Sequence, residues 1–381
     1  MLVIRLFMPK TKPEDTQFMH RAIELARRGA GYVSPNPLVG CVIVKNGEII
    51  GEGWHERYGE AHAEVNAIRD AEVKKKSIEG ATVYVTLEPC AHQGKTGPCA
   101  DKLIEKKIAR CVIAVQDPYQ EVAGKGIAKL KEAGIKVEIG LLDHEAREVN
   151  KFFLKFVTKT LPYVTLKMAM SLDGKVALKS GKSKWISSEP SRAVVHKMRS
   201  EYDAVMVASA TVIADDPELT VRHTEGRNPR RIILDASLRL EEKMKVLSDI
   251  DADKTIILTT HPAYRDKLEK VKQLEKRGVK IYKIGTIEGQ LDLNEAFHIL
   301  AKEDITSIMV EPGPTLSTAM LRAGQFDELV LFLAPIVLGD DAKAGFGDMY
   351  VKDLAKTERL RLFEAKRVEG SDDIYVSYRK V

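Results

Sequence analysis

Short apolar segments alternate with amphipathic helical segments along almost the whole chain, and this alternation limits the possible folds more than any other feature. Strands are expected at 39–44, 48–50, 81–87, 110–115, 163–169, 204–208, 231–234, 255–258, 280–284, 305–310, 328–333 and 374–378. Helical patterns fall at 14–29, 63–71, 100–108, 143–156, 190–200, 263–276 and 293–302. Strands that alternate with helices form largely parallel sheets covered by helices, so the sequence predicts an α/β protein. The dipeptide Asn46-Gly47, between two apolar runs, adds a hairpin.

The length and the pattern together indicate two domains. A chain of 381 residues exceeds one ordinary hydrophobic core. The pair Leu161-Pro162 interrupts the pattern, and the order of strands and helices restarts after it. We therefore expect domains at 1–155 and 156–381, the first of them with three layers, α/β/α.

Composition argues against nucleic-acid and membrane partners. The net charge of +5 is small for this length and not clustered, which favours a small anionic substrate over nucleic acid. No stretch approaches the apolar length of a membrane helix, and the apolar start, with Met1 or Met8 as first residue, is too short for a signal peptide. Cys41 and Cys111 lie in expected strands, which predicts buried free thiols and a cytoplasmic location.

One stretch in the first half carries ligands for a metal ion. His62 offers an imidazole, and Cys90 and Cys99 offer two thiolates. This set suits a tetrahedral zinc ion whose fourth position is kept for water. His-x-Glu followed by Pro-Cys and a second Cys is typical of zinc-dependent deaminases. The alternative is a structural zinc site with four protein ligands, in which His92 or His55 would be the fourth.

Glu64 is the expected proton carrier beside this ion. Successive residues of a helix are rotated by about 100°, so His62 and Glu64 would point nearly opposite ways within one ideal helix. His62 must therefore lie at or before the first turn of the helix. In that position Glu64 is free to take a proton from the activated water and deliver it to the ring nitrogen and the departing amine.

The spacing of the two cysteines narrows the class of deaminase. Nucleoside and tRNA deaminases have Cys-x-x-Cys, whereas eight residues separate Cys90 from Cys99. Three motifs stand around the site: Pro-Asn36-Pro-Leu-Val-Gly, Gly53-Trp-His55-x-x-x-Gly-x-x-His62-Ala-Glu64 and Pro-Cys90-Ala-His92-x-Gly-Lys95-Thr-x-Pro-Cys99. With these motifs the chain resembles the bifunctional deaminase/reductase family of riboflavin biosynthesis over essentially its whole length. Gly97 stands where the family usually has proline, a loop change that should be tolerated.

The resemblance implies a fold, a reaction and a set of residues for the first half. The fold would be like that of cytidine deaminase, and the reaction would replace the amino group of a phosphoribosylated pyrimidine by oxygen. The substrate would contact Asn36, His55, His92 and Lys95. Without the resemblance, Asn36 would be a turn residue, and His55 and Lys95 would be solvated, as such residues usually are.

The second half resembles the reductase domain of the same family, which has a fold like dihydrofolate reductase. The motifs are Lys167-Met-Ala-Met-Ser-Leu-Asp-Gly, Ser183-Lys-Trp185-Ile-Ser187-Ser, His196-x-x-Arg199 and Thr211-Val-x-x-Asp215-Asp-Pro-x-Leu219-Thr-Val-Arg222. NADPH would reduce the ribosyl group to a ribityl chain, with Lys167 and Asp215 nearest the reacting sugar. The substrate would contact Ser183, Arg199, Leu219, Arg222 and Glu311. The cofactor would contact Ala169, Trp185, Ser187, Thr211, Asp215, Ser237 and Gly313.

The charge and the position of several residues in the second half suggest which of them bind phosphate groups. Guanidinium groups match phosphate oxygens, so Arg199 and Arg222 are expected at the substrate phosphate, with an ordinary surface ion pair as the alternative. Ser237 or Arg239 would meet the 2′-phosphate of the cofactor, from position alone. Amides at a helix start near Thr315 would hold a cofactor phosphate.

Two departures from the family bear on cofactor affinity. The chain has Ala208-Ser-Ala210-Thr and Glu311-Pro-Gly-Pro where the family usually has Gly-x-Gly-Thr and Glu-Gly-Gly. Alanine adds a methyl group where backbone and cofactor approach closely. These departures keep open the alternative of a second half that only binds or oligomerises.

The first half leaves a second alternative open. A nucleoside or tRNA base deaminase shares the zinc chemistry, but it needs a basic groove and aromatic platforms, and aromatics are only 6% here. The preferred interpretation is the bifunctional enzyme, with zinc and NADPH as cofactors and a homo-oligomeric assembly.

Overall fold

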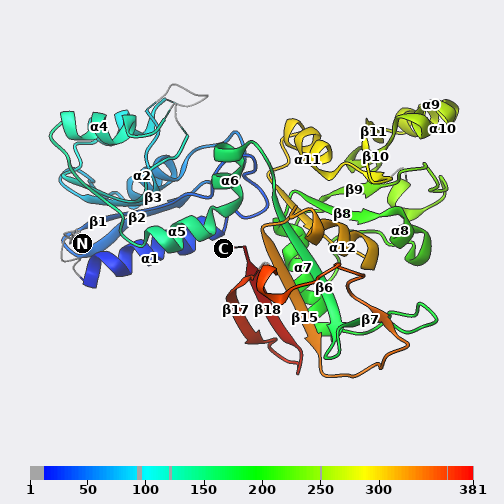
Figure 1. Ribbon diagram of the computed structural model, residues 1–381. Coiled ribbons are helices and arrows are strands. Elements are labelled where there is room, and N and C mark those ends of the chain that lie inside the picture. Colours follow the sequence, from blue (N-terminus) through cyan, green and yellow to red (C-terminus); the bar gives the residue numbers. More distant parts are fainter. Residues whose placement is uncertain (1–12, 92–96, 120–121, 249–250, 358, 381) are drawn as a thin grey trace. The chain divides into compact units, whose positions relative to one another are not determined.

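The computed structural model describes residues 13–91, 97–119, 122–248, 251–357 and 359–380. The chain forms two compact units, Met1–Lys159 and Thr160–Val381 (Figure 1). The second unit therefore begins just before the Leu161-Pro162 pair, where the pattern of the sequence restarts.

A five-stranded sheet in the order β2-β1-β3-β4-β5 forms the centre of the first unit. The strands are β1 (Gly40–Lys45), β2 (Glu48–Trp54), β3 (Thr82–Leu87), β4 (Arg110–Val115) and β5 (Lys136–Ile139). Strand β1 pairs antiparallel with β2 and β3, whereas β3, β4 and β5 are parallel. Asn46 and Gly47 both have positive φ, at 53° and 79°, which confirms the predicted tight hairpin turn.

Helices cover both faces of this sheet. They are α1 (Pro13–Arg27), α2 (Ala63–Val73), α3 (Cys99–Glu105), α4 (Lys125–Glu132), α5 (Asp143–Val149) and α6 (Lys151–Lys159). Buried residues of α1 and α5 form one apolar cluster with the sheet, and those of α2, α3 and α4 form another (Figure 1). The predicted three-layer arrangement is confirmed.

Two of the predicted helices are each two helices in the structure: the one at 143–156 and, in the second unit, the one at 263–276, where His261–Asp266 and Leu268–Lys276 are separate helices. The pattern at 143–156 suggested a single helix, but α5 ends at Val149 and α6 begins at Lys151. Asn150, between them, accepts a hydrogen bond from the backbone N–H of Leu38 and donates one to its carbonyl oxygen, both at 2.8 Å. This pairing ties the interruption to the loop that carries Asn36.

The second unit contains a nine-stranded sheet in the order β11-β10-β9-β8-β14-β6-β15-β18-β17. Its strands are β6 (Tyr163–Ser171), β8 (Ala204–Ala208), β9 (Arg230–Leu234), β10 (Thr255–Thr260), β11 (Lys280–Ile284), β14 (Ser307–Val310), β15 (Glu328–Ala334), β17 (Arg361–Arg367) and β18 (Ile374–Arg379). Neighbours from β11 to β15 are parallel, and β18 and β17 add an antiparallel edge. Two small pairs lie outside it: β7 (Lys175–Ala177) with β16 (Lys343–Ala344), and β12 (Thr286–Ile287) with β13 (Gln290–Leu291).

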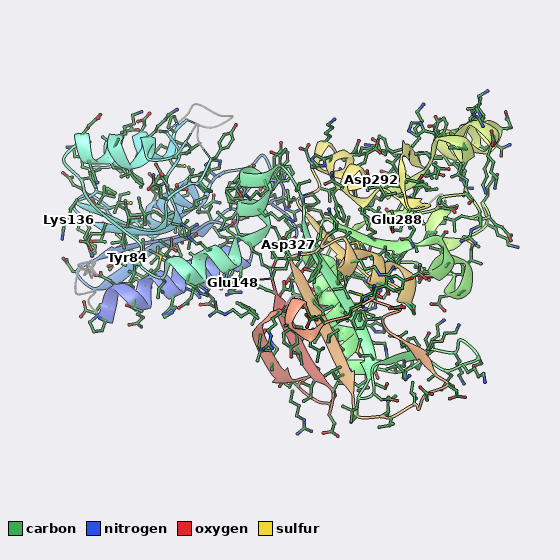
Figure 2. All side chains as sticks on the ribbon, in the orientation of Figure 1. Tyr84, Lys136, Glu148, Glu288, Asp292 and Asp327 are labelled. Atoms are coloured by element: carbon green, nitrogen blue, oxygen red, sulfur yellow. The ribbon has the colours of Figure 1, made fainter. Side chains whose placement is uncertain are left out.

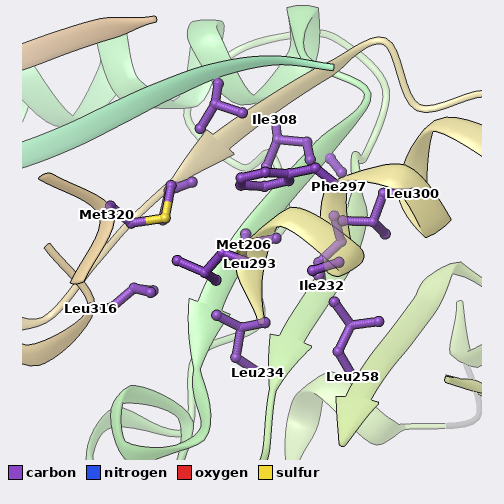
Figure 3. Packing of buried hydrophobic residues seen from close by; sticks show 14 of the residues in the cluster. Met206, Ile232, Leu234, Leu258, Leu293, Phe297, Leu300, Ile308, Leu316 and Met320 are labelled. Atoms are coloured by element: carbon purple, nitrogen blue, oxygen red, sulfur yellow. The ribbon is translucent and has the colours of Figure 1, made fainter. Parts of the chain in front are cut away.

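The helices of this unit are α7 (Glu189–Glu201), α8 (Ser209–Asp215), α9 (His261–Asp266), α10 (Leu268–Lys276), α11 (Leu293–Lys302) and α12 (Pro314–Arg322). Short 3-10 turns lie at Lys245–Leu247, Ala252–Lys254 and Leu354–Lys356. Apolar residues of α11 and α12 form one buried cluster with residues of the sheet, and Figure 3 shows Phe297, Ile308 and Met320 among its members. This shared cluster fixes the loop between β14 and α12, which holds Glu311 and Gly313.

The helix α8 and the strand β17 are the longest of the elements of the second unit that were not predicted from the sequence. Helix α8 has only seven residues and no side-chain cap, so its pattern is too short to recognise. In β17 six of seven residues are exposed, and its sequence lacks the alternation that marks a half-buried strand.

Candidate active site

A cavity of about 410 Å³ in the first unit brings together most of the predicted residues of that half. Asn36, His55, His62, Glu64 and Cys90 all line it. The segment 92–96 lies outside the described residues, so the roles of His92 and Lys95 stay predictions.

His62, Cys90 and Cys99 place three ligand atoms around one point, within 4.8 Å of one another. The Nδ1 atom of His62 lies 3.6 Å from Sγ of Cys90 and 3.4 Å from Sγ of Cys99. Tetrahedral zinc with bonds of about 2.3 Å to sulfur and about 2.0 Å to nitrogen separates such atoms by about 3.5 Å. The three side chains therefore fit a zinc ion, and within the described ranges no other His, Cys, Asp and Glu cluster has this geometry.

Each ligand lies where an element begins or ends. His62 is the N-cap of α2, as the spacing to Glu64 required. Cys90 follows β3 after Glu88 and Pro89, and Cys99 is the first residue of α3. The backbone N–H of Cys99 donates to Sγ of Cys90 at 3.3 Å. Hydrogen bonds from the Cys99 thiol, His62 and this N–H lower the pKa of Cys90, in that order, which favours its thiolate form.

Glu64 lies in the first turn of α2 and is 3% exposed. Burial, with the nearby Cys90 as the next cause, raises the pKa of its carboxyl group to about 7. A carboxyl group with such a pKa both accepts and releases protons near neutral pH, which suits a proton carrier.

His55 is bound on both ring nitrogens. Its Nδ1 lies 3.1 Å from the carbonyl oxygen of Ala61, and its Nε2 lies 3.2 Å from Nδ2 of Asn36. Because Nδ1 must donate to the carbonyl, Nε2 accepts from the Asn36 amide and the ring is neutral. Burial also lowers the pKa of His55. The ring is thus held by Asn36 and Ala61, and His55 does not join the metal-ligand cluster as a fourth ligand.

Several lining residues were not selected from the sequence. They are Tyr58, Glu60, Glu88, Asp117, Tyr119, Phe153 and Val157. Tyr58 lies inside the His55 motif and Glu88 directly precedes Pro-Cys90, so their places in those motifs were signals. The described lining residues include no Lys or Arg, so none of them offers a cation in place of Lys95, which was predicted to contact the substrate.

In the second unit, Glu311 joins two predicted residues that lie far apart in the sequence. Its Oε2 lies 3.1 Å from Nζ of Lys167 on β6, and its Oε1 accepts from Nε of Arg199 on α7 at 2.7 Å. Burial alone would raise the pKa of Glu311, but the charges of Arg199 and Lys167 hold it well below its usual range. Arg199 is 11% exposed, so it is not an ordinary surface pair.

Arg222 is exposed at the end of a largely half-buried segment that contacts this group. Arg199 donates to the carbonyl of Thr220 at 3.2 Å, and Arg222 donates to Glu218 at 2.8 Å. The backbone N–H of Arg222 donates to Nδ1 of His196 on α7 at 3.1 Å. Leu219, in the same segment, is 3% exposed, so its side chain is buried.

Four of the predicted cofactor residues lie in two places: Thr211 in the first turn of α8 with Gly313 near it, and Trp185 and Ser187 in the loop before α7. A Cβ atom on Gly313, the N-cap of α12, would lie 3.8 Å from Oγ1 of Thr211. The exposed Arg239 donates to Ser209 at 3.1 Å, which places a cation beside the first turn of α8. These neighbouring groups, a helix start and an unburied guanidinium, fit the phosphates of a dinucleotide.

The loop before α7 presents an aromatic platform. Trp185 is 70% exposed, and the Arg192 guanidinium lies 4.3 Å from its ring centre. Arg192 also donates to the carbonyl of Ser187 at 2.7 Å.

The structure leaves the remaining reductase predictions in scattered positions. Ala169 shares with Lys167 the less buried face of β6. Asp215 is exposed at the end of α8, Ser183 lies half-buried in a turn, and the side chain of Ser237 is exposed. Their roles stay predictions.

Comparison with known proteins decides between the interpretations. Residues 162–371 match the family described as "RibD C-terminal domain", and residues 12–115 match "Cytidine and deoxycytidylate deaminase zinc-binding region". The riboflavin biosynthesis protein RibD of Aquifex aeolicus is 42% identical, across 96% of this chain and 98% of that protein. The chain belongs to the RibD family.

RibD proteins of known structure share the whole fold. RibD of Acinetobacter baumannii has a TM-score of 0.85 at 38% identity, covering 97% of this chain and 99% of that one. A Thermotoga maritima protein titled diaminohydroxyphosphoribosylaminopyrimidine deaminase/5-amino-6-(5-phosphoribosylamino)uracil reductase has a TM-score of 0.83 at 34% identity, with the same coverage. Escherichia coli RibD is 44% identical over 93% of this chain.

Membership of the RibD family confirms the predicted fold class, a cytidine-deaminase-like domain followed by a dihydrofolate-reductase-like one. It also favours the bifunctional enzyme over the nucleic-acid deaminase with a non-catalytic second half. The two matched regions imply two cofactors, zinc and NADPH. No helix among the described residues is long and apolar enough to cross a membrane.

Proposed function

We propose that this chain catalyses two successive steps of riboflavin biosynthesis. The first unit would deaminate a diaminopyrimidine that carries a phosphoribosylamino group, and the second would reduce the ribosyl group of the uracil product to a ribityl chain. The observation that carries the proposal is the cavity in which His62, Glu64 and Cys90 meet, in a chain that matches a deaminase/reductase over 97% of its length.

In the deamination step the metal ligands, Glu64 and the pyrimidine-binding residues would each have a separate role. A zinc ion held by His62, Cys90 and Cys99 would supply a Lewis acid that activates water. Glu64 would take a proton from the water and pass protons to the ring nitrogen and the amino group, which leaves as ammonia as the new carbon–oxygen bond forms. The neutral His55 accepts one N–H of the Asn36 amide and so orients it, and the remaining donor and acceptor of that amide would hold the polar edge of the pyrimidine.

The reductase step would use the buried group around Glu311. NADPH would supply the hydride to the first carbon of the ribosyl group. Lys167 would donate a proton to the sugar oxygen released as the ring opens, and Glu311 holds the Lys167 ammonium in place at 3.1 Å. Arg199 and the exposed Arg222 would bind the substrate phosphate, and the α8 start with Gly313 would bind the cofactor.

The decisive experiment follows both products in one reaction. Zinc-loaded protein is incubated with the diaminopyrimidine ribotide, and ammonia release is measured without NADPH. NADPH is then added, and its oxidation is measured. Ammonia release followed by NADPH oxidation supports the proposal. Ammonia without NADPH oxidation would contradict the reductase half alone, and no ammonia would contradict the deaminase half.

We also propose a homo-oligomer in the cytoplasm. Support for assembly comes from β17, an edge strand on which Leu362 is 53% exposed and Phe363 41% exposed. Support for a reducing compartment comes from the four cysteines, all free, of which Cys41 and Cys111 are fully buried. Light scattering of the purified chain tests the assembly.

A further inference from the structure

Glu88 is a buried carboxylate beside the deaminase cavity that the proposed chemistry does not use. It follows β3 and directly precedes Pro89 and Cys90. The residue is 4% exposed and lines the cavity. A buried carboxylate is unfavourable unless hydrogen bonds satisfy it, so its partners indicate its role.

Four backbone N–H groups donate to this carboxylate. Oε1 accepts from Gly126 at 2.9 Å and from Ile127 at 3.2 Å. Oε2 accepts from Gly124 at 3.0 Å and from Asp117 at 3.3 Å. With both oxygens engaged twice, Glu88 has no lone pair left to carry a proton between water and substrate. Glu64 lies in the same cavity and is the carboxyl group suited to that task.

Three of these donors belong to the start of α4. Gly124 is the N-cap of α4 and supplies no side-chain cap, so the first N–H groups of the helix need an acceptor from elsewhere. Glu88 provides that acceptor. Its negative charge also lies at the positive end of the helix dipole.

The backbone contact at this point is close. A Cβ atom on Gly126 would lie 1.9 Å from the carbonyl oxygen of Pro89, so only glycine lets α4 approach the residue before Cys90. Glu88 and Gly126 thereby fix the segment 88–90 against α4. The fourth donor, Asp117, lines the cavity together with Tyr119 and Val122.

We propose that Glu88 is a positioning residue that sets both the Sγ atom of Cys90 and the Asp117–Tyr119 wall for deamination. The inference rests on the proposed zinc-dependent deaminase and concerns a residue that does not touch the reacting atoms. One carboxylate joins the segment that carries a metal ligand to the segment that encloses the substrate. Loss of its hydrogen bonds would therefore move both.

The test variant is Glu88→Gln. The amide keeps the size of the side chain, but its NH₂ group cannot accept hydrogen bonds, so about half of the acceptor sites are lost. The matched control is Glu138→Gln. Glu138 is a half-buried carboxylate in the same unit, and it pairs with Arg110 and does not line the cavity. Glu88→Asp keeps four acceptor sites on a shorter side chain and serves if Glu88→Gln does not fold.

The first readout is the absorption spectrum of the cobalt-loaded protein, in which the thiolate-to-cobalt bands report the geometry at Cys90 without substrate. Cobalt affinity should fall by about tenfold to a hundredfold in Glu88→Gln, with shifted bands, as expected when a group that orients a metal ligand is lost. Glu138→Gln should match the wild type, and Glu88→Asp should lie between. The second readout is ammonia release, whose kcat should fall while NADPH oxidation on the deaminated substrate is unchanged.

Unchanged bands and kcat in Glu88→Gln would overturn the proposal. So would equal changes in Glu138→Gln, because destabilisation of the unit would then explain them. If Glu88→Gln fails to fold, a Glu88→Asp protein with wild-type bands and kcat would overturn it as well. Absence of ammonia release in the wild type would instead count against the proposed function, while the cobalt spectra would still test Glu88.

Discussion

Lys167 and Glu311, which are 144 positions apart, form an ion pair in the interior of the second unit, with Nζ 3.1 Å from Oε2. Arg199 binds the other oxygen of the same carboxylate at 2.7 Å. The parallel pairing of β6 with β14 brings the two chain segments together, because Leu166 pairs with Val310. Lys167 directly follows Leu166 and Glu311 directly follows Val310, so the two charged residues lie next to each other where the paired strands end.

The first prediction is that Lys167→Ala abolishes reduction and spares deamination. Loss of a proton donor lowers kcat by about a hundredfold or more. Glu311 retains Arg199, so the unit should still fold. NADPH oxidation and ammonia release, measured on the same preparation, check this result.

The control for Lys167→Ala is Lys272→Ala, an exposed lysine of α10. It should leave both activities at wild-type levels. Equal loss of both activities in Lys167→Ala would point to a folding defect and contradict the assigned role.

Local rules made part of this architecture predictable. Asn46-Gly47 specifies its own turn, and the spacing of His62 and Glu64 placed His62 at a helix start, as observed. The site residues that the sequence did not reveal depend on distant partners. The position of Glu88 directly before Pro-Cys90 signals that it lies at the site, but its hydrogen-bond donors are N–H groups 29 to 39 positions later, which that motif does not predict.

The break between α5 and α6 also depends on a residue far away in the sequence and was therefore not predicted. The pattern at 143–156 is continuous in the sequence, and only the pairing of Asn150 with Leu38, 112 positions away, interrupts it. Propensity is therefore overridden by a tertiary contact.

The second prediction concerns removal of the metal. A chelator should abolish ammonia release and lower the unfolding temperature of the first unit, because His62, Cys90 and Cys99 then lose the ion that joins three separate elements. NADPH oxidation on deaminated substrate should persist. Added zinc should restore ammonia release. Ammonia release that survives chelation, in protein shown to be metal-free, would contradict the zinc mechanism.

The third prediction separates a buried from an exposed ion pair in the first unit. Arg110 binds Asp15 through both NH groups at 2.8 and 2.9 Å and binds Glu138 at 2.7 Å. Lys136 contacts Glu138 at 2.8 Å, but its side chain is 71% exposed. The hydroxyl of Tyr84 donates a hydrogen bond to Asp15, and Figure 2 labels both Lys136 and Tyr84. Arg110→Met should lower the free energy of unfolding by about 3 kcal/mol, because the buried Asp15 then loses the two hydrogen bonds from the Arg110 guanidinium and its charge.

The matched variant Lys136→Met should cost less than about 1 kcal/mol, as exposed pairs do. Urea denaturation of both variants, following the transition that zinc stabilises, measures the difference. Equal losses would mean that burial of Asp15 does not set the strength of this cluster.

The fourth prediction is that the second unit loses stability in mild acid through His196. This ring is 5% exposed and accepts the N–H of Arg222 on Nδ1 at 3.1 Å, so protonation breaks that bond. The pKa of His196 is lowered to about 4 from the usual 6.5, mainly because the ring is buried. The charges of Arg199, His223 and Arg222 lower this pKa further, whereas the charge of Glu311 raises it by a smaller amount. Below pH 6.5 the unfolded chain binds a proton that the folded chain refuses, so stability falls as the pH drops toward 4.

His196→Asn isolates this effect, because the Oδ1 atom of asparagine can accept the Arg222 N–H but does not titrate. Between pH 7 and pH 5 the wild type should lose up to about 2 kcal/mol more than the variant. The measurement is urea denaturation at both values, following the transition whose midpoint rises with added NADPH, since that ligand stabilises the unit that binds it. A wild type and a variant with the same pH dependence would show that other groups cause the acid sensitivity. In that case His196 would contribute only its hydrogen bond to the segment that carries Arg222.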